Sequence, residues 1–123
     1  MPTVLVVDDE WAIADWLAAV IGDMGHRVLT ASNGKMGLDL IKGEHIDLVI
    51  TDYMMPVLDG LAMVAAMRER PTGENIPVII MTAIPESTVR KRLDHYRAYL
   101  RKPFGEAELI AALHKSLNPN PSR

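Results

Sequence analysis

The chain has 123 residues, of which 49% are hydrophobic and 24% charged, and this balance predicts one globular domain with a buried core. It contains no cysteine, which excludes disulfide bonds and thiolate metal sites. The formal net charge of −3 lacks the basic excess that broad nucleic-acid binding requires. No apolar run is long enough to cross a bilayer and the N-terminus lacks a signal-peptide pattern, so we expect a cytoplasmic location.

The first half of the chain alternates between predicted strands and helices. Residues 4–7 form an unbroken apolar run, which is typical of a strand buried on both faces. A helical pattern with one apolar face follows, and Gly25 can end that helix in the left-handed conformation. Residues 27–31 predict a second strand, and Asn33 is placed to cap a second helix that ends near Gly43.

The second half continues the alternation. Residues 46–51 predict a third strand with Asp52 at its C-terminal end, and Asp59 is placed to cap a third helix. Residues 77–81 predict a fourth buried strand, after which Pro85 suits the first turn of a fourth helix. The remaining predicted elements are a short strand, a final helix and a frayed tail, at residues 98–100, 105–117 and 118–123.

Polar side chains stand where the predicted strands end. Strands that alternate with helices indicate a doubly wound α/β fold with a parallel sheet, in one domain over residues 3–117. Ligand sites in such sheets lie beyond the carboxyl ends of the strands. We expect five side chains to meet at that edge, from the ends of four different strands: Asp8, Asp9, Asp52, Thr82 and Lys102.

The chemistry of this group points to a bound cation and a bound anion. Three carboxylates in one crevice repel one another unless they are protonated or neutralised. Oxygen ligands without His or Cys favour a hard ion, Mg²⁺ or Mn²⁺. Lys102 and the Thr82 hydroxyl then describe a pocket for a compact dianion such as a phosphoryl group. Each residue alone has an ordinary interpretation as a turn, a cap or a surface charge, and the hypothesis depends on their combination.

Four ordered motifs resemble the receiver domain of two-component response regulators. They are VVDDE at residues 6–10, DYMMPVLDG at 52–60, VIIMTA at 78–83 and YLRKPF at 99–104. The resemblance extends over residues 3–117. It implies a five-stranded, flavodoxin-like (CheY-like) sheet with the strand order 2-1-3-4-5 and five helices.

The resemblance implies a phosphorylation site at Asp52. This residue would accept a phosphoryl group from the phosphohistidine of a sensor histidine kinase or a histidine phosphotransfer protein, in a reaction that requires Mg²⁺. Asp9, Asp52 and the Met54 backbone carbonyl would bind the ion directly, and Asp8 through a water, with Mn²⁺ as a substitute.

The resemblance also assigns roles to residues on the fourth and fifth strands. Lys102, the Thr82 hydroxyl and the backbone near Ala83 would hold the phosphoryl oxygens. A cis peptide bond is expected before Pro103. Thr82 would move toward the phosphoryl group and Tyr99 would turn inward, although a half-buried strand tyrosine is the simpler interpretation of Tyr99.

The implied protein is a signalling domain rather than a conventional enzyme, although it catalyses its own phosphorylation and dephosphorylation. The face formed by the fourth helix, fifth strand and fifth helix would contact a downstream protein or a fused output domain. Phosphorylation can also drive dimerisation in such domains. No direct contact with nucleic acid or membrane is expected. The sequence leaves open whether the domain stands alone or belongs to a larger regulator or hybrid kinase.

The sequence departs from the family pattern beside the site and in the fourth helix. Met54 and Ile84 are apolar where polar residues are common, and our hypothesis is that they hinder water and prolong the life of the acyl phosphate; the alternative is that they pack against a partner. His95 and Tyr96 replace a Gly-Ala pair, with His95 in the place of a left-handed cap, so we expect a short or irregular fourth helix. The basic residues 90–92 form a solvated face or a docking patch for an acidic partner.

Three other functions fit the sequence less well. An aspartate-nucleophile phosphatase of the haloacid dehalogenase type needs a second acid where Met54 stands. A flavin-binding flavodoxin needs a Ser/Thr/Gly-rich loop where this chain has Asp8 and Asp9. An interaction domain without phosphorylation would not need the complete set of site residues.

Overall fold

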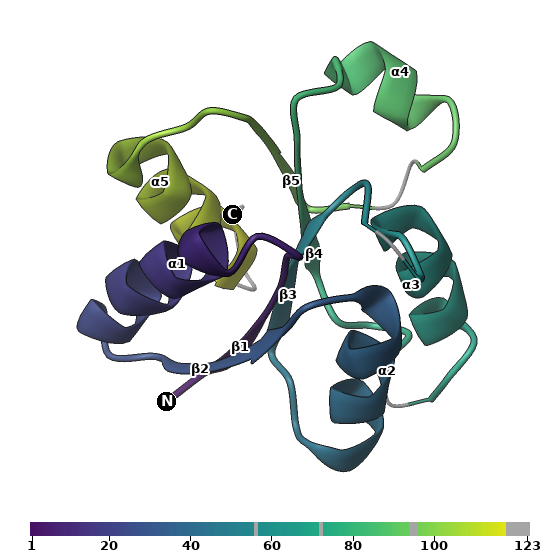
Figure 1. The fold of residues 1–123 in the computed structure, drawn as a ribbon. Helices are drawn as coiled ribbons and strands as arrows, with labels where there is room; N and C mark the ends of the chain where they lie inside the picture. The colour runs from purple at the N-terminus through teal and green to yellow at the C-terminus, as the bar shows by residue number, and fades with distance from the viewer. Residues whose placement is uncertain (56, 72, 94–95, 118–123) are drawn as a thin grey trace, which may run out of the picture.

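The computed structural model describes residues 1–55, 57–71, 73–93 and 96–117. A central sheet is covered on one face by α1 and α5 and on the other by α2, α3 and α4 (Figure 1). The strands are β1 Thr3–Val7, β2 Arg27–Ala31, β3 Leu48–Asp52, β4 Val78–Thr82 and β5 Ala98–Arg101. The helices are α1 Trp11–Asp23, α2 Gly34–Gly43, α3 Gly60–Arg68, α4 Glu86–Arg90 and α5 Glu106–Leu117.

The sheet has the predicted topology. Its five strands are all parallel and lie in the order β2-β1-β3-β4-β5. The chain therefore leaves β1 toward β2 on one side and continues through β3 on the other, which places the switch point of the doubly wound fold between β1 and β3. The predicted α/β fold class and strand order are confirmed.

The central strands read as continuous apolar runs because helices cover both of their faces. Every residue of β1, β3 and β4 is buried. In β1, Val4 and Val6 pack toward α1 and α5, whereas Leu5 and Val7 pack toward α2 and α3. The alternation of side chains along each strand thus divides the core into two halves.

Local signals set several element ends as predicted. The Asn33 side chain accepts a hydrogen bond from the Met36 N–H (3.0 Å) at the start of α2. Asp59 accepts one from the Ala62 N–H (2.8 Å) at the start of α3. Gly25 has a φ of +92°, so a residue without a Cβ suits this position after α1.

Three strands end one residue later than predicted, β3 at Asp52, β4 at Thr82 and β5 at Arg101. Asp52 pairs with Met81 in the ladder of β3 and β4, and Thr82 pairs with Arg101 in that of β4 and β5. These polar residues therefore close the strands rather than follow them. The fourth helix is short, as predicted, with five residues.

Some predictions concern parts of the chain outside the described residues. They are the left-handed cap at His95 and the frayed tail at 118–123. Across the described ranges, no helix combines the length and the apolarity that a membrane span needs.

Candidate phosphorylation site

Asp52 is the last residue of β3 and is buried. The loop that follows returns closely over it, since the Gly60 N–H donates a hydrogen bond to the Tyr53 carbonyl (2.9 Å). A Cβ on residue 60 would lie only 2.2 Å from the Asp52 carbonyl oxygen. Glycine at this position therefore lets α3 begin directly against the end of β3.

Asp8 and Asp9 follow β1, the strand next to β3. Asp8 is buried, and its Oδ1 accepts a hydrogen bond from the Glu10 N–H (2.9 Å) at the start of α1. Asp9 is exposed to solvent. Each residue of the group Asp8, Asp9 and Asp52 offers one carboxylate oxygen, and these oxygens lie within 4.8 Å of one another.

Lys102 reaches this cluster from the segment after β5. Its backbone N–H donates to the Thr82 carbonyl (2.9 Å), and the peptide bond between Lys102 and Pro103 is cis. The ammonium nitrogen lies 3.2 Å from Asp8 Oδ2 and 3.2 Å from Asp52 Oδ2. The structure therefore brings together four of the five predicted strand-end residues, Asp8, Asp9, Asp52 and Lys102, around one point.

Burial and charge compete at this point. Burial raises the pKa of the Asp52 carboxyl above its ordinary value of 3.8, because the opposing effect of Lys102 is weaker than burial and the Asp8 charge together. Burial alone would lower the pKa of Lys102, but the charges and hydrogen bonds of Asp52 and Asp8 outweigh it and raise this pKa. Lys102 is therefore cationic at neutral pH, and a negative charge on Asp52 is disfavoured while no further cation is present.

The cluster fits a hard divalent cation. Within the described residues, Lys102 is the cation that pairs with Asp8 and Asp52. One ammonium group cannot neutralise three carboxylates in a partly buried site. The donors are all oxygen atoms, which suit Mg²⁺ and not the softer transition metals.

Thr82 lies on the neighbouring strand and is connected to Tyr99 through one residue. The Thr82 hydroxyl accepts a hydrogen bond from the Ile84 N–H (3.1 Å), and the Tyr99 hydroxyl donates to the Ile84 carbonyl. Ala83, which lies between Thr82 and Ile84 in the chain, is exposed. The two backbone polar groups of Ile84 are thus held by the two predicted switch residues, an arrangement that the sequence pattern did not predict.

Two other features of the site were not predicted. Glu10, which was not predicted as a site residue, lies 3.8 Å from the Lys102 ammonium through Oε1. Trp11 lines a groove of about 520 Å³ together with Asp8 and Asp9, although its side chain is 78% exposed. The sequence does show an aromatic residue directly after three acids. The helical pattern that begins there explains Trp11 equally well without a role in the site.

Comparison with known proteins identifies the class of domain. The response regulator receiver domain family matches residues 4–114, and the chain belongs to this family. Response regulator MprA of Mycolicibacterium vanbaalenii is 36% identical over 118 residues, which cover 93% of this chain and 49% of that protein. The chain therefore spans about half the length of this curated relative.

Solved structures agree with this assignment. Chemotaxis response regulator CheY4 of Vibrio cholerae has a TM-score of 0.90 at 28% identity, covering 95% of this chain and 99% of that one. The receiver domain of sensor histidine kinase PA1611 from Pseudomonas aeruginosa has a TM-score of 0.87 at 26% identity, covering 95% and 98%. That structure holds a magnesium ion coordinated in the active-site cleft. The chain is thus a signalling domain of two-component systems.

Proposed function

We propose that Asp52 is the phosphoacceptor of this receiver domain and that residues 3–117 fold as one unit around it. The observation that carries the proposal is the meeting of three carboxylate residues with Lys102, whose ammonium lies 3.2 Å from Asp52 Oδ2. A structural ion pair would need one carboxylate, whereas a site that transfers a phosphoryl group needs an oxygen nucleophile, a metal site and a cation together.

The proposed reaction forms one bond and breaks one. An Asp52 carboxylate oxygen attacks the phosphorus of a phosphohistidine on a sensor kinase or phosphotransfer protein, while the phosphorus–nitrogen bond breaks. Its electrons return to the imidazole, which takes up a proton, and Asp52 becomes an acyl phosphate. The signal ends when water attacks the phosphorus of the acyl phosphate. The bond between phosphorus and the Asp52 oxygen breaks, which restores the carboxylate and releases inorganic phosphate.

Mg²⁺ would be held by Asp9, Asp52 and the Met54 carbonyl, with Asp8 acting through a water. When bound, the ion supplies positive charge that offsets the repulsion between the carboxylates and the incoming phosphoryl oxygens. The magnesium in the PA1611 receiver domain supports this assignment. Mn²⁺ has the same preference for oxygen ligands and should substitute.

Lys102 and Thr82 would hold the phosphoryl group. The Lys102 ammonium, now paired with Asp8 and Asp52, can turn its hydrogen bonds to phosphoryl oxygens without leaving the site. The Thr82 hydroxyl would donate to another oxygen, and the backbone N–H of Ala83, an exposed residue, would add a further donor.

Movement of Thr82 would also carry the signal. Its hydroxyl now accepts the Ile84 N–H, and a shift toward the phosphoryl group breaks this bond. Ile84 is then free to move, and with it the carbonyl that holds the Tyr99 hydroxyl. The face of α4, β5 and α5 would change shape in response and contact a downstream protein or a fused output domain.

Acetyl phosphate with Mg²⁺ tests the proposal directly. Wild type should become labelled on one residue, and Asp52→Ala should not be labelled. Asp39→Ala removes an exposed carboxylate from α2 and should be labelled like wild type. EDTA should abolish labelling. Labelling of the Asp52→Ala protein would refute the assignment.

A further inference from the structure

A cavity of about 460 Å³ lies between the end of α1 and the end of α5, which cover the same face of the sheet (Figure 1). Five residues line it: Met24, His26, Leu113, His114 and Leu117. His26 directly precedes β2, so the cavity lies at the amino ends of the parallel strands, whereas Asp52 lies at their carboxyl ends. The cavity is therefore separate from the candidate phosphorylation site.

A tight turn holds two of the lining residues next to each other. The Gly25 N–H donates to the Gly22 carbonyl (2.9 Å), and Gly25 has a φ of +92°. The His26 N–H donates to the Ile21 carbonyl (3.4 Å). Met24 and His26 flank the glycine, and Met24 also packs against the core. The turn thus fixes the backbone that carries a thioether and an imidazole beside the same cavity.

The imidazole of His26 contains a buried nitrogen atom without a partner. The side-chain atom is Nδ1, and it has no hydrogen bond within the described residues. Buried polar atoms are nearly always paired, because an unpaired one has given up its contact with water without a replacement. A metal ion is an alternative partner for an imidazole nitrogen. This atom is the observation that points to a ligand for the cavity.

His114 contributes a second imidazole from α5. Its side chain is exposed, so it can change rotamer toward His26 without a change in the backbone. Its neighbours in the lining, Leu113 and Leu117, pack against the core and form an apolar wall. Among the described residues, the lining contains no carboxylate, ammonium or guanidinium group. The cavity thus combines two imidazoles and a thioether in uncharged surroundings.

We propose that this cavity binds Cu⁺ through the imidazoles of His26 and His114 and the thioether of Met24. Imidazole and thioether ligands suit Cu⁺, whereas Mg²⁺ and Mn²⁺ prefer carboxylate and other oxygen ligands. The cost of taking an ion out of water grows with its charge, so the apolar wall favours a monovalent ion over Zn²⁺. Rotation of the His26 ring about Cβ–Cγ would turn Nδ1 toward the ion, which becomes its partner.

The ion would join the turn after α1 to the end of α5, two segments that are far apart in the chain. A ligand that binds only the folded state stabilises that state. Cu⁺ should therefore raise the melting temperature of the protein. This binding is independent of the proposed function, because no residue of the cavity takes part in holding the phosphoryl group or Mg²⁺.

Competition with the coloured Cu⁺ chelator bicinchoninate, without oxygen and with ascorbate present, tests binding to the full chain. Wild type should remove one Cu⁺ per chain from the chelator. His114→Gln and Met24→Leu should each weaken this binding by about tenfold or more, since loss of even an outer partner of a metal ligand costs about 10–100-fold. Both variants should fold, because His114 is exposed and leucine has about the volume of methionine.

Matched controls remove the same chemical groups elsewhere. His45→Gln takes away an exposed imidazole before β3, and Met36→Leu takes away an exposed thioether on α2. Both proteins should bind Cu⁺ as wild type does. They should also keep the rise in melting temperature, which His114→Gln should lose. Equal losses of Cu⁺ affinity in the cavity variants and in these controls would overturn the proposal.

X-ray absorption at the copper edge reads the ligands directly. The spectrum of the wild-type complex should contain nitrogen and sulfur neighbours, and Met24→Leu should remove the sulfur contribution. Wild type that takes no Cu⁺ from the chelator, or a spectrum without sulfur, would overturn the inference. Zn²⁺ that binds the cavity more tightly than Cu⁺ would also overturn it.

The two proposals fail separately. The variants of the cavity should be labelled by acetyl phosphate like wild type, because Asp52 and Lys102 are unchanged. If wild type binds Cu⁺ in the cavity but Asp52 is not labelled, the phosphoacceptor proposal falls alone. If Asp52 is labelled but Cu⁺ does not bind in the cavity, the copper inference falls alone.

Discussion

Asp52 and Lys102 illustrate how single residues in this domain are held in a balance of opposing effects. Burial makes the negative charge of Asp52 costly, and the ammonium of Lys102, 3.2 Å away, reduces that cost without removing it. Removing Lys102 would leave the carboxylates with no fixed cation among the described residues. An additional positive charge would therefore stabilise the Asp52 carboxylate further, and a divalent ion would supply it.

Val57 is a second residue under local stress. It has a φ of 70°, a left-handed conformation that β-branched side chains adopt only at a cost, and its side chain is 77% exposed. Val57→Asn should therefore raise the free energy of unfolding by about 1 kcal/mol, since asparagine tolerates this conformation and little burial is lost. Urea unfolding measures the change. Val57→Thr keeps the branched Cβ and should not stabilise; an Asn variant no more stable than the parent would contradict this account.

Met54 governs access to the phosphoryl group in our hypothesis. Its side chain is 63% exposed next to Asp52 and has no group that could orient an attacking water. With Met54→Asn or Ile84→Glu, the acyl phosphate should hydrolyse roughly tenfold faster, a small part of the ~10²–10⁴ that a positioned polar group can contribute. Loss of label after removal of acetyl phosphate gives the rate. Met54→Leu should behave like the parent, and an unchanged rate in both polar variants would count against the hypothesis.

At the scale of elements, the junction of β3 and α3 positions the phosphoacceptor. Gly60→Ala would place a Cβ 2.2 Å from the Asp52 carbonyl oxygen, so the loop or the strand end must shift. We expect a loss of about 2–3 kcal/mol in stability and slower labelling by acetyl phosphate.

Gly22 provides the matched control for this substitution. It lies in α1, where a Cβ would meet nothing within 4 Å, so Gly22→Ala should stabilise by about 0.5–1 kcal/mol. Urea unfolding measures the stability of the two variants. It compares Gly60, where α3 approaches the end of β3 closely, with Gly22, where no other segment lies near. A Gly60→Ala protein as stable as the parent would show that the junction can relax.

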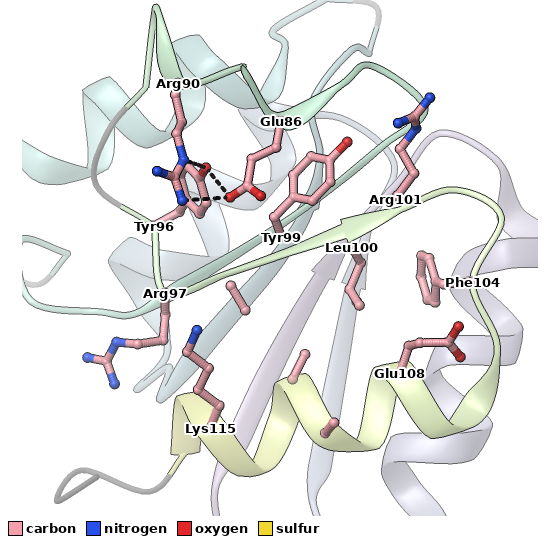
Figure 2. Close-up of a pocket in the computed structure, with 13 residues that line it drawn as sticks. Glu86, Arg90, Tyr96, Arg97, Tyr99, Leu100, Arg101, Phe104, Glu108 and Lys115 are labelled. Carbon is pink, nitrogen blue, oxygen red and sulfur yellow. Dashed lines mark hydrogen bonds and ion pairs between the residues drawn. The ribbon is translucent and has the colours of Figure 1, made fainter. Parts of the chain in front are cut away.

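The helix α4 depends on its contacts rather than on its own length. Five residues cannot form a stable helix in isolation. Val89 anchors it in the core, and the hydrogen bonds among Glu86, Arg90 and Tyr96 tie it to the segment before β5 (Figure 2). This explains how α4 can be short and still be held against the rest of the fold.

At the scale of the whole molecule, the charge distribution links stability to metal binding. In metal-free protein the raised pKa of Asp52 means that the folded state resists ionisation of this carboxyl. Below pH 3.8 the carboxyl is protonated in both the folded and the unfolded state, so its ionisation costs the fold nothing. As the pH rises from 3.8 to the raised pKa, the unfolded state ionises first and the folded state loses stability. Asp52→Asn should therefore raise the melting temperature in EDTA at neutral pH. It should also reduce the fall in melting temperature as the pH rises above 3.8.

Magnesium should restore the stability that metal-free wild type loses when Asp52 ionises. An ion that binds only the folded state at one hundred times its Kd stabilises it by about 2.7 kcal/mol. Thermal unfolding with and without Mg²⁺ should show this increase in wild type and a much smaller one in Asp52→Asn. Equal increases in the two proteins would place the ion elsewhere.

Much of the fold was predictable because its signals are local. Unbroken apolar runs indicated strands covered on both faces, and Asn33 and Asp59 indicated helix starts through hydrogen bonds to backbone groups three residues away. The same patterns indicated the strand ends to within one or two residues. The site prediction followed, since the ends of parallel strands share one edge.

The contacts between distant segments were not predictable in this way. Lys102 and Asp8 are 94 residues apart in the chain, and the sequence predicted that they lie at one edge of the sheet but not that their side chains share a hydrogen bond. The contact of Glu10 with Lys102, and the position of Ile84 between Thr82 and Tyr99, likewise depend on side-chain directions that no periodicity encodes.

The sequence by itself determined the order of strands and helices, the two-sided core and the carboxylates at the strand ends, because short-range sterics, capping and burial decide these. Only the tertiary structure decided that Lys102 bridges Asp8 and Asp52, and that the backbone of Ile84 connects Thr82 with Tyr99. The physical reason is that distances between side chains on different elements depend on how the whole sheet and its helices pack.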